Sequence, residues 1–307
     1  MNAKILEVKN LTKGFSKVLA VNNLSFSIQS GEIFALLGPN GAGKTTTVRM
    51  LTDIIKPDSG IINYNFNNSL SKVNKNSFLG YLPEERGLYQ EIPIIKSLIY
   101  LGIIRGMDKK DARKSAEMWL EKLELFERRF DKLNTLSKGN QQKIQFISSI
   151  LHNPIFAILD EPFSGFDPIN QELFISIIKE LATTGTTILL SAHQMHLVEK
   201  IADRVHLLNK GETVVTGTIK EIKSNFRADE IIYIKTAEQI NEVKFNNLEI
   251  IKTFEKISDH ECKLIVHNNS KLNDLLSHII NLNTIISIKS ANITLHDIFI
   301  QLIKGKE

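Results

Sequence analysis

Short apolar runs alternate with segments of helical periodicity along the first two thirds of the chain. Ile33–Leu37 and Ile155–Leu159 are continuous apolar runs, and Thr187–Leu190 is a third segment of this kind. Runs of this length are typical of buried strands. Between them, apolar positions such as Ala112, Ala116, Leu120 and Leu123 recur at helical spacing. This alternation predicts an α/β core.

Other segments near the N-terminus predict a second, smaller sheet. Lys4–Asn10 has strand character, and Leu24, Phe26 and Ile28 alternate with serines as in a half-buried strand. We expect these strands to form an antiparallel sheet beside the core. Lys56–Gly60 is a turn signal, and we interpret the Asn-rich stretch 63–76 as a solvated turn region.

A helical insert is predicted between the strands of the core, at about residues 90–150. Phe78–Leu82 has the pattern of a strand, and helical periodicity follows from Pro93 to about Phe130, with Asp108 as a candidate cap. Leu136–Gln142 then opens another helix. The insert therefore separates two strands of the same core.

The last ninety residues have a different pattern, which predicts a domain boundary between residues 218 and 219. Expected strands are Ile231–Lys235, Leu248–Phe254, Cys262–His267 and Ile285–Lys289. Expected helices are Ile219–Phe226, a weak one near Ala237–Val243, Ser270–Leu282 and Thr294–Ile303. This order favours a small α+β domain of ferredoxin-like topology at 219–307.

One stretch of the first domain carries a phosphate-binding pattern. Gly38-Pro39-Asn40-Gly41-Ala42-Gly43-Lys44-Thr45-Thr46 fits G-x-x-x-x-G-K-[ST]. Glycines let backbone N–H groups turn inward, and the following helix start adds a positive dipole end. Lys44 is then placed for the outer phosphates of a nucleotide and the Thr45 hydroxyl for Mg²⁺. A glycine turn without ligand is the alternative, which the flanking strand and helix disfavour.

Acidic residues follow two of the predicted strands. Asp160 and Glu161 come directly after Ile155–Leu159; Asp160 can hold Mg²⁺, and Glu161 can take a proton from a water that attacks the γ-phosphate. Glu84 follows another strand, at the edge where α/β sheets bind ligands, or is a solvated carboxylate. His193 ends a third strand; a lone histidine is usually structural, but its position favours a functional role.

Two further segments allow a functional and a structural interpretation. Ser137 and Gly139 open a helix, which offers a second anion-binding end or simply a capped start. Phe15 lies between Gly14 and Ser16, where it can stack on an adenine ring or serve as an ordinary packing residue.

Composition narrows the class of protein. Hydrophobic residues make up 42% and charged residues 23%, and the net charge of +4 comes without a basic block that would indicate nucleic-acid binding. No apolar run is long enough to span a membrane, and no signal peptide is expected. The single cysteine, Cys262, fits a reducing compartment and a buried position. His260, His267, His278 and His296 are too scattered to predict a metal site.

In their order, these motifs resemble the ATP-binding subunit of ABC transporters over about residues 4–218. The resemblance implies that Phe15 stacks on adenine, that Ser137 and Gly139 reach the γ-phosphate held by another subunit, and that Asp167, in the turn Ser164–Pro168, lies at the dimer seam. It also implies that Glu84 senses the metal. His193 corresponds to the γ-phosphate switch.

Three positions depart from the family pattern. Lys138 replaces a glycine and Asn140 a glutamine of the signature motif, and Glu84 replaces a glutamine. Lys138 either adds positive charge near the phosphates of a partner or points to solvent. Because Ser137 and Gly139 are kept, we expect hydrolysis to survive.

The resemblance also implies cofactors and partners. It predicts ATP and Mg²⁺, a head-to-tail homodimer or paired ATPase subunit, and a separate transmembrane permease at the cytoplasmic face of a bacterial-type membrane. The C-terminal domain is similar to the accessory domain of bacterial efflux ATPases for sodium or antibiotics, which favours export. Alternatives are a soluble ABC ATPase of translation or DNA repair, and an ATP-gated regulatory module.

Overall fold

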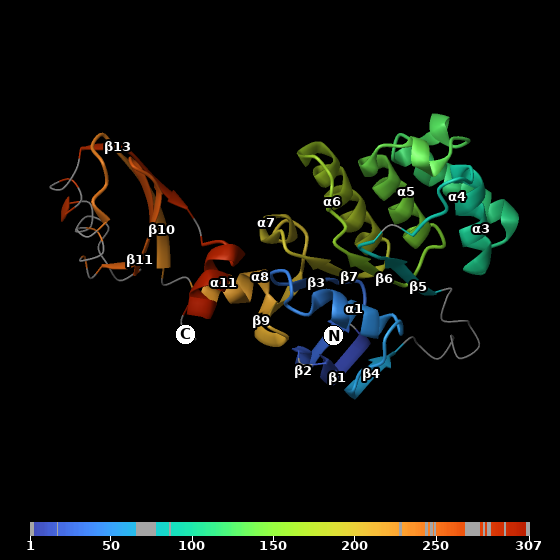
Figure 1. Cartoon of the computed structure of the whole chain (residues 1–307), viewed down its shortest axis with the longest axis horizontal. Helices are drawn as coiled ribbons and strands as arrows, with labels where there is room; N and C mark the ends of the chain where they lie inside the picture. The colour runs from blue at the N-terminus through green and yellow to red at the C-terminus, as the bar shows by residue number, and fades with distance from the viewer. Residues whose placement is uncertain are drawn as a thin grey trace. The chain divides into compact units, whose positions relative to one another are not determined.

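The computed structural model describes residues 3–16, 18–65, 78–85, 87–226, 229–242, 245, 248, 250–267, 277–278, 280, 284–291 and 293–304. The chain forms two compact units, Met1–Gly217 and Thr218–Glu307 (Figure 1). Among the described residues, no helix is both long and apolar enough to cross a membrane.

A six-stranded sheet forms the centre of the first unit. Its strands, in spatial order, are β5 (Leu79–Leu82), β6 (Phe156–Asp160), β7 (Thr187–Ala192), β3 (Ile33–Leu37), β8 (Arg204–Asn209) and β9 (Glu212–Thr218). The pairs from β5 to β8 are parallel. Every residue of β3, β6 and β7 is buried, as their apolar runs predict. Three helices connect to these strands: α1 (Lys44–Leu51), α6 (Pro168–Thr183) and α7 (Met195–Val198).

The smaller antiparallel sheet of this unit has the order β2 (Val18–Gln29), β1 (Lys4–Phe15) and β4 (Ser59–Tyr64). Leu24 and Ile28 of β2 share one hydrophobic core with Phe34 and Leu36 of the central sheet. The strand β4 was not expected. The sequence predicts a turn at Gly60 and a solvated turn region from Asn63 onward, whereas Ser59–Tyr64 is a strand; residues 66–76 of that region lie outside the described residues.

The helical insert consists of α3 (Ile94–Ile104), α4 (Lys109–Lys122) and α5 (Lys138–Ile150), with two 3₁₀ turns at Phe126–Arg128 and Leu133–Thr135. In Figure 1 these helices gather beside the β5 edge of the central sheet. The stripe predicted from helical spacing is fully buried at Ala112, Ala116, Leu120 and Leu123. Asp108 occupies the N-cap position of α4, but its side chain makes no capping hydrogen bond.

The second unit begins with α8 (Ile219–Asn225) and has the strands β10 (Asp229–Thr236), β11 (Ile251–Ser258), β12 (Glu261–His267) and β13 (Ile285–Ala291), followed by α11 (Leu295–Lys304). The spatial order is β11-β12-β10-β13, and all neighbours are antiparallel. This is the order of a ferredoxin-like sheet, as the sequence predicts. Ile232, Ile234, Cys262 and Leu264 line one core on one face.

The prediction of a helix near Ala237–Val243 is wrong over residues 237–241, which are irregular. Their backbone donors have distant partners instead: the N–H of Ala237 donates to the carbonyl of Thr284 at 2.9 Å and that of Ile240 to Asp259 at 2.8 Å. These hydrogen bonds attach the segment to the ends of other elements and take the place of the i to i−4 hydrogen bonds of a helix. Of the helix expected at 270–282, only 277–278 and 280 are described, and they are helical.

Candidate functional site

The glycine-rich loop between β3 and α1 passes so close to neighbouring backbone at two positions that only glycine fits there. Gly38, Gly41 and Gly43 all have positive φ. A Cβ atom on Gly38 would lie 2.5 Å from the carbonyl oxygen of Leu208, and one on Gly43 would lie 2.4 Å from that of Ala20. The loop is thus pressed against its neighbours, and its shape is set before any ligand arrives.

Lys44, the first residue of α1, is buried within this loop. Its Nζ donates to the carbonyl oxygens of Gly38 at 2.8 Å and Pro39 at 3.2 Å. The same ammonium lies 3.7 Å from Oε1 of Glu161. With only 6% of its surface exposed, Lys44 is a localised positive charge in a low-dielectric setting, which suits a polyphosphate.

Ser191 organises the acidic end of β6. In the parallel pairing of β6 and β7 it lies directly opposite Asp160, and its Oγ donates a short hydrogen bond to Asp160 Oδ1. The backbone N–H of Glu161 donates to both the carbonyl oxygen of Ser191 at 3.1 Å and its Oγ at 3.2 Å. Sequence reasoning missed Ser191, although a polar residue at the end of a buried strand was a usable signal.

Asp160 is fully buried and has one unpartnered oxygen. Its pKa is raised to about 6: burial is the largest cause, the nearby carboxylates of Glu84 and Glu161 also raise it, and the hydrogen bond from Ser191 and the charge of Lys44 lower it. Its Oδ2 has no hydrogen-bond partner within the described part of the chain. A buried carboxylate oxygen of this kind calls for a cation or a donor that the chain itself does not supply.

Glu161 and His193 are brought together because they follow β6 and β7, which are neighbours in the sheet. Nδ1 of His193 lies 2.9 Å from Oε2 of Glu161. Glu161 is 8% exposed and has a left-handed backbone with φ of 50°, a conformation that costs energy for a residue with a side chain. The carboxylate is therefore held by Lys44 on one side and by the imidazole on the other.

Glu84 lies close to the start of α1 on a loop that α5 supports. Its Oε2 is 3.5 Å from Oγ1 of Thr45. The amide of Gln145 donates to the carbonyl oxygens of Pro83 at 3.2 Å and Glu85 at 2.9 Å, which brackets Glu84. Gln145 is a second residue that sequence reasoning missed, because nothing in its helical pattern marks this role.

The oxygens near Thr45 fit a magnesium ion that arrives with a nucleotide. They are the free Oδ2 of Asp160, the Thr45 hydroxyl and the Glu84 carboxylate. Over the described residues, no group of three or more His, Cys, Asp or Glu is arranged to hold a metal alone. Mg²⁺ typically takes one or two protein oxygens and completes its shell with phosphates and water.

Four other predicted site residues stand apart from this cluster. Ser137 caps α5, accepting from the N–H of Asn140 at 3.3 Å, and Asp167 caps α6, accepting from that of Asn170 at 2.8 Å. The hydrogen bond from Asn170 lowers the pKa of Asp167. Phe15 ends β1 with 47% of its surface exposed. A Cβ on Gly139 would meet nothing closer than 3.9 Å, so packing inside the chain does not require glycine there.

Taken together, the strand, the glycine loop, the buried lysine and the serine-bonded aspartate define a P-loop nucleotide-hydrolysing protein. The comparisons with known proteins specify the kind. Residues 21–164 match the family described as "ABC transporter", and residues 217–303 match "ATP-binding protein DrrA1-3-like, C-terminal domain".

Curated relatives agree over nearly the whole length. The uncharacterized ABC transporter ATP-binding protein YhaQ of Bacillus subtilis is 37% identical over 305 residues, which cover 97% of this chain and 98% of the relative. The linearmycin resistance ATP-binding protein LnrL of the same organism is 32% identical over 91% of this chain and 92% of its own. The chain therefore belongs to the ATP-binding proteins of ABC transporters, and it is an ABC ATPase.

Solved structures support the same fold for the first unit. An ATP-binding subunit of an ABC transporter superposes with a TM-score of 0.66 at 28% identity and covers 73% of this chain and 93% of that one. A dimeric cassette in a post-hydrolysis state, bound to ADP and phosphate, superposes with a TM-score of 0.62 at 23% identity, over 70% of this chain and 98% of that one. The predicted fold class is thus confirmed.

Proposed function

We propose that this ATPase works with Mg²⁺ as a head-to-tail dimer and drives export through a separate transmembrane subunit at the cytoplasmic face of the membrane. The relative LnrL is named for resistance to linearmycin, and the C-terminal match is to a DrrA-like domain. Both favour the export of a toxic compound such as an antibiotic. The meeting of Lys44, Asp160 and Glu161 in one buried cluster carries the proposal.

In this proposal the glycine loop binds the phosphates of ATP. Lys44 exchanges the carbonyls of Gly38 and Pro39 for phosphate oxygens, and the loop N–H groups and the start of α1 complete the cradle. Thr45, Asp160 and Glu84 hold the magnesium ion, which neutralises phosphate charge. Phe15, exposed at the end of β1, provides a stacking surface for the adenine ring.

Glu161 acts as the general base. Its carboxylate accepts a proton from the water that attacks the γ-phosphorus, while the bond from that phosphorus to the bridging oxygen breaks. His193, at 2.9 Å from this carboxylate, orients it and reaches toward the γ-phosphate. Ser191 fixes the positions of both carboxylates, because it hydrogen-bonds to the backbone of Glu161 and to the side chain of Asp160.

A second chain supplies the remaining contacts. Ser137 and Gly139 lie at the start of α5, where backbone N–H groups are available as donors, and Asp167 lies at the start of α6. In the described residues, none of these three makes a hydrogen bond or ion pair with Lys44 or Asp160. Next to Asp167, Ile169 is 83% exposed. An apolar side chain this open, in the first turn of α6, suits a surface that another subunit covers.

The helical insert suits the membrane partner. On α3, Tyr100, Ile103 and Ile104 are each more than 40% exposed. Large apolar side chains that gather on one short helix favour a docking surface. Pull-down from solubilised membranes tests this assignment, and recovery of only cytosolic proteins would point to the alternative of a soluble ABC ATPase.

The decisive experiment replaces the base. Glu161→Gln keeps the shape of the side chain but cannot accept the proton, so we expect steady-state phosphate release to fall by about 10²- to 10⁴-fold. ATP binding should persist, and light scattering after size exclusion should show an ATP-dependent dimer. Glu172→Gln, an exposed position on α6, is the matched control. A monomeric Glu161→Gln protein that still binds ATP would contradict the shared site.

A further inference from the structure

The carboxylate of Asp58 is held against the end of β1, next to the exposed residue Phe15. Asp58 lies in the connection from α1 to β4. Its Oδ2 accepts a hydrogen bond from the N–H of Gly14 at 2.7 Å, and its Oδ1 accepts one from Nζ of Lys13 at 2.6 Å. Its own N–H donates to the carbonyl oxygen of Thr12 at 2.9 Å. One residue therefore binds the three residues of β1 that precede Phe15.

These contacts continue the hydrogen bonding of β1 beyond its pairing with β4. The described pairing of the two strands ends with Thr12 opposite Ser59. Because alternate residues of an antiparallel strand face the same neighbour, the N–H of Gly14 points to the edge of β1 that β4 does not reach. A backbone N–H without a partner is unfavourable, and the Asp58 carboxylate supplies the acceptor. The hydrogen bond from Gly14, and after it that from Lys13, hold the pKa of Asp58 below its usual value.

Lys13 links Asp58 to the ring of Phe15. The Nζ of Lys13 lies over the face of this ring, 5.6 Å from its centroid. An ammonium group at this distance is attracted by the ring. The side chain of Lys13 is only 18% exposed, whereas Phe15 is 47% exposed. The ring is therefore restrained by Lys13, and much of its surface remains open to a ligand.

Asp58 is also connected to the helix that carries Lys44. Directly after α1, the N–H groups of Ile54 and Ile55 donate to the carbonyl oxygen of Arg49 at 2.9 and 3.2 Å. The connection from α1 to Asp58 is therefore short and is attached to the helix by hydrogen bonds. As a result, the end of β1 and the phosphate loop are joined through the same helix.

We propose that Asp58 is a positioning residue for the nucleotide: it holds the end of β1 and, through Lys13, the ring of Phe15 in place relative to the phosphate loop. In this role Asp58 acts through Phe15 and takes no part in hydrolysis. A stacking surface that is ordered before the base arrives lowers the entropy cost of binding. The proposal rests on the proposed function, since it assumes that adenine stacks on Phe15.

Calorimetry on the full-length protein with Mg²⁺ tests the proposal with two ligands. ADP carries the base, and pyrophosphate, measured by competition against ADP, lacks it. For Asp58→Ala we expect the affinity for ADP to fall by about three- to tenfold, a part of what truncating a stacking aromatic residue costs, and the affinity for pyrophosphate to stay the same. The KM for ATP should rise by a similar factor with kcat unchanged. Glu180→Ala, which removes another exposed carboxylate paired with a lysine, is the matched control and should change neither affinity.

Two further variants separate positioning from a general loss of stability. Asp58→Asn keeps an acceptor for the N–H of Gly14 and loses the charge that pairs with Lys13, so its affinity for ADP should lie between those of the parent chain and Asp58→Ala. This variant decides should Asp58→Ala not fold. When Phe15→Ala is already present, Asp58→Ala should weaken ADP binding no further, because the surface that it positions is gone.

The outcomes also distinguish this inference from the proposed function. If Phe15→Ala binds ADP as tightly as the parent chain, the stacking surface is wrongly assigned and the role of Asp58 falls with it. If Phe15→Ala weakens ADP binding and Asp58→Ala does not, only the positioning role is overturned. It is also overturned if Asp58→Ala weakens pyrophosphate binding by the same factor as ADP binding, or if its effect on ADP persists in the Phe15→Ala background.

Discussion

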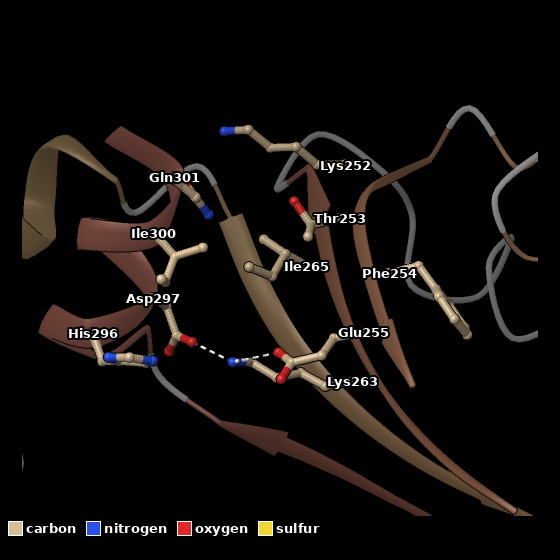
Figure 2. A pocket seen from close by; sticks show the side chains of 10 residues that line it. All are labelled: Lys252, Thr253, Phe254, Glu255, Lys263, Ile265, His296, Asp297, Ile300 and Gln301. Carbon is tan, nitrogen blue, oxygen red and sulfur yellow. Dashed lines mark hydrogen bonds and ion pairs between the residues drawn. The ribbon is translucent and has the colours of Figure 1, made fainter. Parts of the chain in front are cut away.

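Among the described residues, each unit buries one aspartate, and the two are held in opposite ways. Asp160 of the first unit has a partner on one oxygen only, and burial raises its pKa to about 6. Asp297 of the second is bonded by Lys263 and Thr294. The Nζ of Lys263 also lies 3.4 Å from Oε2 of Glu255 (Figure 2). Although its burial alone would raise the pKa, these hydrogen bonds hold the pKa of Asp297 below its usual value.

The contrast distinguishes Asp160, whose free oxygen is available to a ligand, from Asp297, whose partners stabilise the fold. Charge without a partner is unfavourable in the folded chain, so Asp160 costs stability until a cation arrives. Charge with full partners is costly only when one of them is removed. The number of partners, rather than burial, therefore distinguishes the two roles.

The largest effect is expected at Lys44. Lys44→Ala removes a cation that would contact two phosphates, and charged hydrogen bonds contribute about 1.5–3 kcal/mol each. We expect ATP affinity to fall by at least about 100-fold, measured by calorimetry, with no change in hydrogen exchange of the C-terminal sheet. Unchanged ATP affinity would remove the basis for assigning the loop.

The next effect tests the paired aspartate. Asp297→Asn leaves Lys263 with only the exposed Glu255, so we expect the free energy of unfolding of the second unit to fall by about 2–4 kcal/mol, less than for a fully buried pair. Hydrogen exchange of β10 and β12 reports it. A variant as stable as the parent chain would show that the Lys263 network contributes nothing.

The unpaired aspartate should respond with the opposite sign. Asp160→Asn removes a buried charge, so the nucleotide-free protein at about pH 8 should gain about 1–3 kcal/mol in the first unit, the scale of a shift of roughly two pKa units. The same variant should lose ATPase activity. Thermal melting monitored by exchange of β6 and β7 measures the gain, and a loss of stability would mean that Oδ2 of Asp160 has a partner as well.

The smallest effect is a pH dependence. Because the pKa of Asp297 is lowered from 3.8 in the folded chain, its stabilising contribution is complete above that value and is lost as the pH falls through the folded pKa. The difference in stability between the parent chain and Asp297→Asn should therefore be constant near neutral pH and shrink toward about pH 3. A difference that stays constant to that pH would indicate an unshifted carboxyl group.

Much of the fold could be predicted because the strands of the core are buried on both faces. Their apolar runs and the glycine loop that follows β3 leave few alternatives, and the ferredoxin-like order of the second unit followed from element order. The strand β4 was missed because Gly60 resembles a turn residue. In fact a Cβ there would lie 2.5 Å from the carbonyl oxygen of Asn10, so this glycine permits close pairing with β1.

The candidate site was predictable only where chemistry and position coincide. Asp160, Glu161 and His193 each end or follow a strand, and Lys44 ends the glycine-rich motif at the start of a helix. Ser191 and Gln145 did not stand out, because their roles depend on contacts between distant segments. The periodicity of a helix does not reveal that one of its glutamines, Gln145, hydrogen-bonds to a loop sixty residues earlier in the chain.

The parallel alignment of β6 with β7 makes the chemistry of the first unit depend on strand registration. Asp160 faces Ser191 because the two strands run in step from Phe156 and Thr187 onward. A one-residue slip would turn Asp160 to the opposite side of the sheet and leave Glu161 without its anchor. Catalytic activity therefore depends on the correct register of two apolar strands along their whole length. A register error far from the phosphates would be as disabling as loss of the general base.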